Sequence, residues 1–464
     1  MADQPLEYDV AVLGGGPGGI AAALRAASRG ANTCLIEAKR LGGACLNVGC
    51  VSTKAMLAAS GLFWRLRHAE QFGICAAAPT VDGRAFMKRP AEVVQTLRAG
   101  LEKNIASRKN LELIRGRGRL AGPDAVTIRT AEDEKRIRAG SIVIATGSRP
   151  IRPDFLPWAS PRVMTSDEAV AAIDLPESVI VIGGGALGCE FATVYSELGI
   201  RTHLVEMLET LLPGLDRDAA AAVTELLMER GAELLTGRKV VGMKATADGV
   251  TAQLDDGRIL EAACALVAVG RQADIEDIGL AEAGVHVTDG IIPVDERCRT
   301  NVENVYAVGD VAEKRQYAHL AERMGVVAAE NATGHDLCDD RAVVPSGVYT
   351  HPEVAWVGLN ECEARERFGS VRVLRCSYRN SPAALAYGQT GGQVKILVDS
   401  ETGRIRGASW IGPHAVDMIH ELALAMRQEI TIEQIYHTVH AHPTLQEAVR
   451  AAANHWMAPA TGRD

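Results

Sequence analysis

The stretch Gly14-Gly15-Gly16-Pro17-Gly18-Gly19 decides the fold of this chain, together with the segments on either side of it. The apolar run Tyr8–Leu13 before it predicts a buried strand, and residues 20–25 after it predict a helix. A second apolar run, residues 33–36, ends in Glu37. A strand, a glycine-rich turn, a helix and a second strand that ends in an acid are the βαβ unit that binds dinucleotides.

Three of these glycines have separate roles in such a unit. Gly14 allows the tight turn, Gly16 lets the backbone approach a pyrophosphate, and Gly19 lets the helix pack closely on the strand. The Glu37 carboxylate accepts hydrogen bonds from a ribose hydroxyl. Glu37 follows Gly14 by 23 residues (37 − 14 = 23), a spacing that suits this unit.

The same unit recurs later in the chain. Residues 178–182 predict a strand, and three spaced glycines follow it: Gly183, Gly185 and Gly188. The next strand ends in Glu206, again 23 residues after the first glycine (206 − 183 = 23). Two matched units predict two nucleotide-binding domains with electron transfer between their nucleotides. The Glu206 carboxylate, with no arginine in the ten residues after it, favours NAD over NADP.

A different feature, Gly42-Gly43-Ala44-Cys45-Leu46-Asn47-Val48-Gly49-Cys50, follows the first unit and leads into a helical segment with Lys54. Cysteines five apart on a regular helix cannot form a disulfide, which needs Cα atoms about 4.4–6.8 Å apart. The glycines must therefore bend the segment, and Cys50 then begins the next helix. A thiolate is stabilised there by the helix dipole and by nearby cations. This pattern predicts a redox-active dithiol.

A structural disulfide and a zinc site are weaker interpretations of the cysteine pair. A structural disulfide is typical of secreted chains, whereas the remaining cysteines here are scattered, which favours a reducing cytosol. A zinc site usually needs a second close pair of ligands, and the sequence shows none. We therefore expect no metal site.

The overall composition excludes several classes of protein. The 464 residues suffice for about three domains. A net charge of −9 and an aromatic content of 4% disfavour a nucleic-acid partner, and the alternation Arg115-Gly116-Arg117-Gly118-Arg119 is interpreted as the solvated face of a strand. Residues 1–7 have no signal-peptide core, and no run of 18 apolar residues exists. We expect a cytoplasmic protein with no membrane segment.

From about residue 343 the pattern changes to short alternating strands and a helix predicted over Ala415–Arg427, which indicates a separate α+β domain. Its last motif is His440-Ala441-His442-Pro443-Thr444, followed by Glu447. One interpretation is a capping box, in which Thr444 caps a helix and Glu447 completes the cap. The other is that His442 acts as a general base oriented by Glu447. The two interpretations are compatible.

Taken together, these residues resemble the pyridine nucleotide–disulfide oxidoreductases, and within them the dihydrolipoamide dehydrogenase group. The resemblance extends from Asp9 to about Ala451, and its most specific parts are the motifs around the two cysteines and around His442. It implies an α/β fold with two Rossmann-like dinucleotide-binding domains, one for FAD and one for NAD, and a C-terminal α+β dimerisation domain. The implied boundaries are 1–150 for the FAD-binding domain with the dithiol, 151–275 for the NAD-binding domain, 276–345 for a central segment that completes the FAD domain, and 346–464 for the interface domain.

The resemblance also implies which residues bind the cofactors. For FAD these are Gly14, Gly16, Gly19, Glu37, Lys54, Gly118, Ala145, Thr146, Gly147, Asp310, Ala318 and His319. For NAD they are Gly183, Gly185, Gly188, Glu190, Glu206, Val240 and Gly270. In the family pattern, Lys54 reaches the flavin and Glu190 pairs with it.

The activity implied by the resemblance is oxidation of dihydrolipoamide on a lipoylated partner protein, with NAD as the final acceptor. Cys45 would exchange with the substrate thiol, Cys50 would pass electrons to the flavin, and His442 with Glu447 would be the base, acting across the interface of a homodimer. No lipoyl domain precedes the first strand, so the lipoyl group is expected on another chain.

Three alternatives to this activity stay open. The chain could be a glutathione-reductase-like enzyme, a mercuric-reductase-like enzyme, or a redox-sensing flavoprotein subunit without turnover. The chain also departs from the family pattern at Ser52, where the family usually has proline. A proline there would pre-set the start of the helix.

Overall fold

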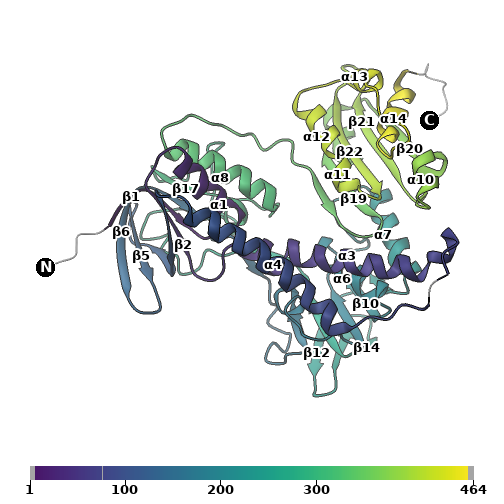
Figure 1. The fold of residues 1–464 in the computed structure, drawn as a ribbon, viewed down its shortest axis with the longest axis horizontal. Helices are drawn as coiled ribbons and strands as arrows, with labels where there is room; N and C mark the ends of the chain where they lie inside the picture. The colour runs from purple at the N-terminus through teal and green to yellow at the C-terminus, as the bar shows by residue number, and fades with distance from the viewer. Residues whose placement is uncertain (1–5, 76, 458–464) are drawn as a thin grey trace.

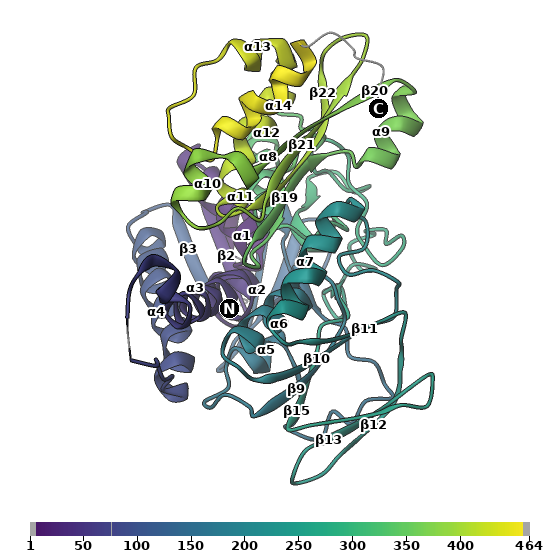
Figure 2. The same cartoon turned by 90° about the vertical axis from the view of Figure 1, so that its right-hand side faces the viewer.

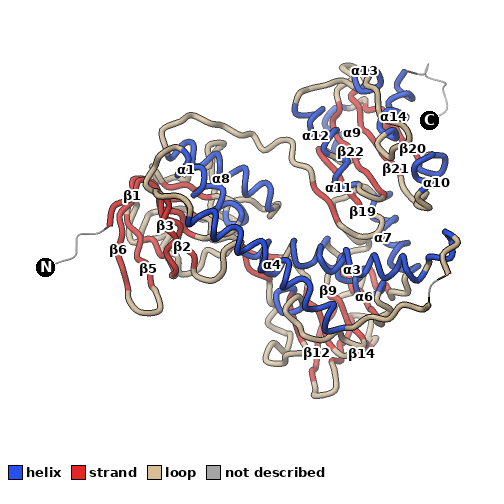
Figure 3. The backbone as a smooth tube through the Cα atoms, in the orientation of Figure 1, coloured by secondary structure: helices blue, strands red, loops and turns tan. Residues whose placement is uncertain are grey.

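The computed structural model describes residues 6–75 and 77–457, and these form three units (Figure 1). Two units are built on mostly parallel sheets, and the third is an antiparallel sheet with helices packed on it (Figure 3). The predicted α/β class, with two nucleotide-binding units and a C-terminal α+β domain, is confirmed. The sequence predicts no signal-peptide core in residues 1–7, and most of these residues lie outside the described ranges.

The first unit is a seven-stranded sheet in the order β3-β2-β1-β6-β5-β4, in which β17 pairs with β6. Its strands are β1 (Leu6–Leu13), β2 (Thr33–Glu37), β3 (Leu111–Arg115), β4 (Arg117–Leu120), β5 (Ala125–Arg129), β6 (Glu134–Ile144) and β17 (Val305–Ala307). Every residue of β2 and β17 is buried, as expected for parallel strands covered on both faces. The arginines in residues 115–119 are exposed, as predicted. They lie at the end of β3 and the start of β4, however, and not on one strand.

Helices α1 (Pro17–Ser28) and α8 (Ala318–Ala332) pack against each other on this sheet. Their contact is close, because a Cβ atom at Gly325 would lie 2.2 Å from the carbonyl oxygen of Gly18. The segment that follows the second unit therefore returns to the first, where it supplies β17, the short helix η2 (Gly309–Val311) and α8.

The second unit has a parallel sheet in the order β11-β10-β9-β15-β8 and a separate antiparallel sheet β12-β13-β14. Its elements are β8 (Val163–Thr165), α5 (Ser166–Ala169), β9 (Ser178–Ile182), α6 (Ala186–Glu197), β10 (Arg201–Glu206), α7 (Arg217–Glu229), β11 (Glu233–Thr236), β12 (Val240–Ala245), β13 (Val250–Leu254), β14 (Ile259–Ala262) and β15 (Cys264–Val267). A two-stranded ribbon, β7 (Ser148–Pro150) with β16 (Arg271–Ala273), carries the chain between the two units. The predicted boundary at 150 lies at the end of β7, and the one at 275 lies just after β16.

The cysteine segment forms two helices, α2 (Gly43–Val48) and α3 (Cys50–Arg67), and α3 packs against α4 (Gly83–Ala106) and α6. The predicted bend is present at Gly49, which has φ −129° and ψ −115°. Within the described residues, Gly43–Arg67 is long and apolar enough by composition to cross a bilayer. We interpret it as an internal helix pair, because it is broken at Gly49 and packs on two other helices.

The third unit is a sheet in the order β18-β19-β22-β21-β20, which lies above α6 and α7 (Figure 2). Its elements are β18 (Ser346–Val348), β19 (Glu353–Gly358), α9 (Glu361–Phe368), β20 (Val371–Ser377), α10 (Pro382–Ala386), β21 (Gln393–Asp399), β22 (Ile405–Gly412), α11 (Ala415–Met418), α12 (His420–Arg427), α13 (Ile432–His437) and α14 (Glu447–Met457). The single helix predicted over Ala415–Arg427 is wrong. The chain forms α11 and α12 there, separated at Ile419.

The third glycine of each nucleotide unit is required by packing. A Cβ atom at Gly19 would lie 1.8 Å from the carbonyl oxygen of Gly14, and one at Gly188 would lie 1.9 Å from that of Gly183. No real Cβ contact is that short, so the helix can approach the turn only where the side chain is absent. Gly185 differs, because a Cβ atom there would have no heavy atom within 4 Å.

We expect Gly188→Ala to lower the free energy of unfolding by about 2 kcal/mol or more, because the added methyl group displaces α6 from the turn. Gly185→Ala is the matched control and should lie within about 1 kcal/mol of the unsubstituted protein, since alanine is a poorer N-cap residue than glycine. Chemical denaturation of both variants checks this. Equal losses in the two variants would contradict the packing argument.

Candidate active site

A cavity of about 2200 Å³ runs between the three units and collects most of the predicted site residues. Its lining includes Cys45, Cys50, Gly14, Gly16, Glu37, Lys54, Gly118, Ala145, Thr146, Gly147, Asp310, Ala318, His319, Gly183, Gly185, Glu190, Glu206, Val240 and Gly270. Gly19 and Gly188 are not part of the lining, because they face the turn of their own unit. His442 and Glu447 also lie outside it.

At the first unit, the Glu37 carboxylate closes the glycine turn. Its Oε2 accepts the N–H of Gly15 at 2.7 Å, and its Oε1 accepts the N–H of Lys39 at 2.6 Å. Glu37 is buried, and its bond to Gly15 forms away from water. Each carboxylate oxygen still has a second lone pair for a ligand hydroxyl.

The second unit repeats this arrangement atom for atom. Glu206 accepts the N–H of Gly184 at 2.6 Å through Oε2 and that of Leu208 at 2.8 Å through Oε1. The first glycine of each unit also has a left-handed backbone, with φ +105° at Gly14 and +108° at Gly183. The two turns are therefore equivalent loops, and both line the same cavity.

Both loops suit a pyrophosphate. The twelve-residue helices α1 and α6 have Gly16 and Gly185 as their N-cap residues, and no side chain caps either N-terminus. The free N–H groups and the helix dipole make each N-terminus an anion site. The open space above Gly185 would be filled by any side chain, and both glycines line the cavity. The residues present thus fit two dinucleotides.

Other residues predicted for the first nucleotide also line the cavity. Thr146 donates to the carbonyl oxygen of Asp274 at 2.8 Å, which fixes the turn after β6. His319, in the first turn of α8, contacts the carbonyl oxygen of Pro345 through Nε2 at 2.8 Å, and burial lowers the pKa of its ring. The uncapped N-terminus of α8 faces the cavity at Ala318.

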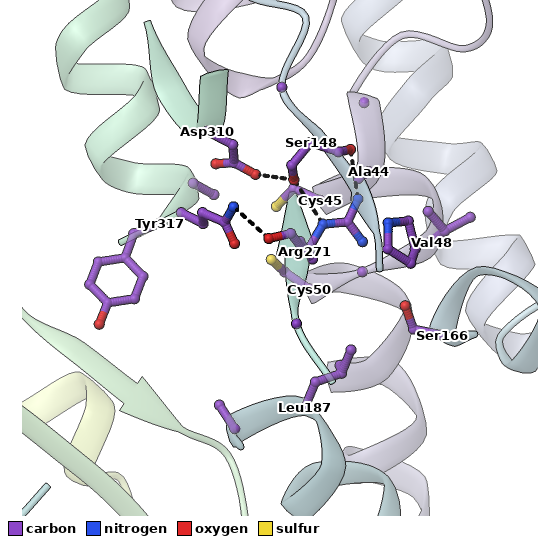
Figure 4. Close-up of a pocket in the computed structure, with 18 of the residues that line it drawn as sticks. Ala44, Cys45, Val48, Cys50, Ser148, Ser166, Leu187, Arg271, Asp310 and Tyr317 are labelled. Atoms are coloured by element: carbon purple, nitrogen blue, oxygen red, sulfur yellow. Dashed lines mark hydrogen bonds between the residues drawn. The ribbon is translucent and has the colours of Figure 1, made fainter. Parts of the chain in front are cut away.

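The side chains of Cys45 and Cys50 lie together in this cavity, one from α2 and one from the start of α3 (Figure 4). Both are free thiols. The neighbouring Cys50 thiol and burial raise the pKa of Cys45. The Cys45 thiol and then the Lys54 ammonium outweigh burial at Cys50 and lower the pKa of its thiol to about 7. Cys50 is therefore the sulfur that carries the negative charge.

Lys54 lies one turn after Cys50 and makes the predicted pair with Glu190. Its Nζ lies 2.8 Å from Oε2 of Glu190, and it also lies 4.5 Å from the centre of the Tyr349 ring. Burial disfavours the ammonium, but the Glu190 carboxylate outweighs burial and holds the pKa of Lys54 above its usual value. Tyr349 donates its backbone N–H to Glu190 at 3.1 Å. No motif indicated Tyr349, which comes from the third unit.

A second connection that no motif indicated joins the ribbon between the units to Asp310 (Figure 4). Ser148 donates its hydroxyl to Oδ2 of Asp310 at 2.5 Å, and Arg271 donates Nε to the Ser148 hydroxyl at 2.8 Å. Gln316 donates to the carbonyl oxygen of Arg271 at 3.2 Å. Asp310 is thus oriented by residues of both strands of the ribbon.

The predicted pair of His442 and Glu447 is present, with Nδ1 of His442 3.0 Å from Oε1 of Glu447. A hydrogen bond from the N–H of Thr444 and then the pairing with His442 lower the pKa of Glu447. Only half of the predicted capping box forms. The hydroxyl of Thr444 donates to the carbonyl oxygen of Ala441 instead of capping α14. The His442 side chain is 66% exposed, so it is available to a second molecule.

Residues 8–325 match the family model described as pyridine nucleotide-disulphide oxidoreductase, and residues 344–453 match the model of the dimerisation domain of that family. The chain belongs to this family. The predicted family membership is therefore confirmed, and the third unit is a dimerisation domain of this type. The two glycine turns and the dithiol fall within the first match.

The sequences of individual relatives match nearly the whole length of this chain. A dihydrolipoyl dehydrogenase of Chlamydia pneumoniae is 39% identical over 442 residues, which are 95% of each chain. A dihydrolipoyl dehydrogenase of Bacillus subtilis is 36% identical, over 96% of this chain and 97% of its own. The crystal structure of LpdA from Mycobacterium tuberculosis has a TM-score of 0.90 and 28% identity, and the match covers 98% of this chain and 100% of that one.

We expect Lys54→Met to raise the pKa of the Cys50 thiol above about 7, because the nearby positive charge is lost. Alkylation of the reduced protein by iodoacetamide, followed across pH 5–10, measures this pKa. The pH at which Cys50 becomes reactive should move upward. Lys54→Arg keeps the charge and serves as the control. An unchanged reactivity profile in Lys54→Met would contradict the assignment.

Proposed function

We propose that this chain oxidises protein-bound dihydrolipoamide and reduces NAD, with FAD as the internal electron carrier. The observation that carries the proposal is the dithiol in the cavity that also contains both glycine turns. A thiol with a pKa of about 7 at Cys50 suits a sulfur that leaves as thiolate during disulfide exchange. The dihydrolipoyl dehydrogenases of similar sequence support the same activity.

The cofactors are assigned to the two equivalent loops. FAD would be held by the first unit, through the α1 N-terminus, Glu37, Asp310 and the α8 N-terminus, and NAD by the second unit, through the α6 N-terminus and Glu206. FAD would supply a two-electron acceptor for the dithiol, and NAD would supply the final hydride acceptor. In this proposal residues 1–150 and 276–345 form the FAD-binding domain, 151–275 the NAD-binding domain and 346–464 the interface domain.

The thiol chemistry uses Cys45, Cys50 and Lys54 of one subunit together with His442 of the second subunit. In the oxidised enzyme, Cys45 and Cys50 form a disulfide. His442 removes a proton from one substrate thiol, and the resulting thiolate attacks Sγ of Cys45. This forms a mixed disulfide and releases Cys50 as a thiolate, which Lys54 and the N-terminus of α3 stabilise. The second substrate thiol then attacks the substrate sulfur of the mixed disulfide and closes the lipoamide ring. Its proton passes to Cys45, and two electrons now reside in the dithiol.

His442 is the better base of the two histidines in its motif. Its Nδ1 is oriented by Glu447, and within the described residues its Nε2 has no partner. The His440 side chain is only 6% exposed, and both its ring nitrogens face oxygen acceptors. Because His442 lies outside the cavity of its own chain, we propose a homodimer in which it completes the site of the other subunit.

Several observations distinguish this proposal from its alternatives. Glu206 occupies the position where a 2′-phosphate would bind, which disfavours the NADP preference of a glutathione-reductase-like enzyme. A mercuric-reductase-like enzyme carries a C-terminal cysteine pair, whereas the last cysteine here is Cys376. A redox sensor without turnover would not need the His442–Glu447 pair.

The partner is a lipoylated protein of a multienzyme system, and we propose a cytoplasmic location.

A steady-state assay with purified reduced lipoyl proteins tests this function directly, with NAD and NADP compared side by side. We expect rapid NADH formation and a strong preference for NAD. Bleaching of the flavin by NADH with no turnover of any dihydrolipoyl protein would instead favour a sensor. Turnover only with NADP would contradict the role given to Glu206.

We expect His442→Gln to slow dihydrolipoamide oxidation by about 10²- to 10⁴-fold, because the general base is lost. Cys50→Ser should abolish the reaction, while reduction of ferricyanide by NADH continues in His442→Gln. Mixed dimers of the two variants provide the sharper measurement. Each mixed dimer contains one intact site if His442 acts across the interface, so activity should return on mixing. No recovery in mixed dimers would contradict a shared site.

A further inference from the structure

The loop that carries His442, residues 438–446, is held by one carboxylate from another helix. Glu421, in the first turn of α12, contacts Nε2 of His440 through Oε1 at 3.0 Å. Its Oε2 accepts a hydrogen bond from the side-chain amide of Gln446. The two contacts lie on either side of His442, so Glu421 ties together both ends of the segment that presents the ring.

The His440 side chain makes one of these two contacts with Glu421. Its Nδ1 faces the carbonyl oxygen of Thr438 at 3.1 Å, and its Nε2 faces Glu421. Both ring nitrogens thus face oxygen atoms, and a carboxylate oxygen is a strong hydrogen-bond acceptor. The side chain is 6% exposed. Its position and bonding make it a structural link between the loop and α12.

The contacts inside the loop are of a different kind. Glu447 accepts from Thr444 at 2.9 Å and pairs with Nδ1 of His442 at 3.0 Å, so it sets the rotation of the His442 ring. It does not fix the loop against the rest of the domain, because it begins α14 at the end of the same segment. Glu421 is the carboxylate that connects the loop to a separate element.

We propose that Glu421, acting through His440 and Gln446, is a positioning residue for His442. The role of His442 rests on the proposed function, whereas the attachment of the loop does not. Catalysis by a general base depends on placement, and a displacement of about 1 Å can cost about 100-fold in rate. A base that is 66% exposed on a loop needs such an anchor.

Hydrogen exchange of the holoenzyme tests the attachment without any substrate. Glu421→Gln keeps the shape but removes the negative charge, so the contacts with His440 and Gln446 lose the extra strength that a charged acceptor gives. Gln446→Leu removes one contact and leaves Glu421 in place. We expect backbone amides of residues 438–446 to exchange about tenfold faster in both variants. Glu429→Gln, which breaks only an exposed pair with Arg404, is the matched control and should leave that segment unchanged.

Kinetics then test whether the attachment acts through His442. We expect Glu421→Gln to lower kcat for dihydrolipoamide about tenfold with little change in KM, while reduction of ferricyanide by NADH stays at the wild-type rate. The variant with both Glu421→Gln and His442→Gln should be no slower than His442→Gln alone, because one effect is exerted through the other.

Unchanged exchange in Glu421→Gln and Gln446→Leu would overturn the proposal, and so would a double variant markedly slower than His442→Gln. If the wild-type enzyme does not oxidise dihydrolipoamide, the proposed function fails, and the exchange measurement alone decides whether Glu421 holds the loop. Faster exchange together with non-additive kinetics supports the full proposal.

Discussion

The carboxylate of Glu190 connects all three units at the dithiol. It lies on α6 of the second unit, pairs with Lys54 on the dithiol helix at 2.8 Å, and accepts the N–H of Tyr349 from the third unit at 3.1 Å. Glu190 is 2% exposed. An unpaired carboxylate at that depth is costly, so none of the three segments can move away alone. Cys50, one turn before Lys54, therefore keeps a fixed position between the two nucleotide loops.

A second buried carboxylate repeats this connection farther along the same helices. Glu197 follows Glu190 by seven residues, which is about two turns, and so it lies on the same face of α6. It accepts the Ser60 hydroxyl at 2.6 Å from α3, and it lies 2.9 Å from Nδ1 of His351 in the third unit. Arg230, just after α7, lies 3.2 Å away and balances the charge. Two anchored points fix the direction of α3 as well as its position, so the cavity has a defined shape.

Local motifs predicted much of this site. The glycine turns, their acids and the bend between the cysteines all depend on residues close in sequence, where spacing determines geometry. The link from Arg271 to Ser148 and the contact of Glu421 with Gln446 were not predicted. The first spans 123 residues and depends on the pairing of β7 with β16, and the second depends on how α12 packs beside the last loop. No pattern in one sequence encodes such contacts, because they follow from the completed packing.

The departure at Ser52 shows how the dithiol loop is held without the usual proline. Ser52 is the third residue of α3, where a backbone N–H has no partner inside the helix, so the backbone at this position tolerates proline. Its hydroxyl donates to the carbonyl oxygen of Asn47 at 3.1 Å, and its side chain is buried. Asn47 belongs to α2, and its side-chain amide holds the carbonyl oxygens of Leu41 and Gly43. A hydrogen bond between the two helices thus restrains the cysteine loop here, where a proline would act by restricting the backbone of α3 alone.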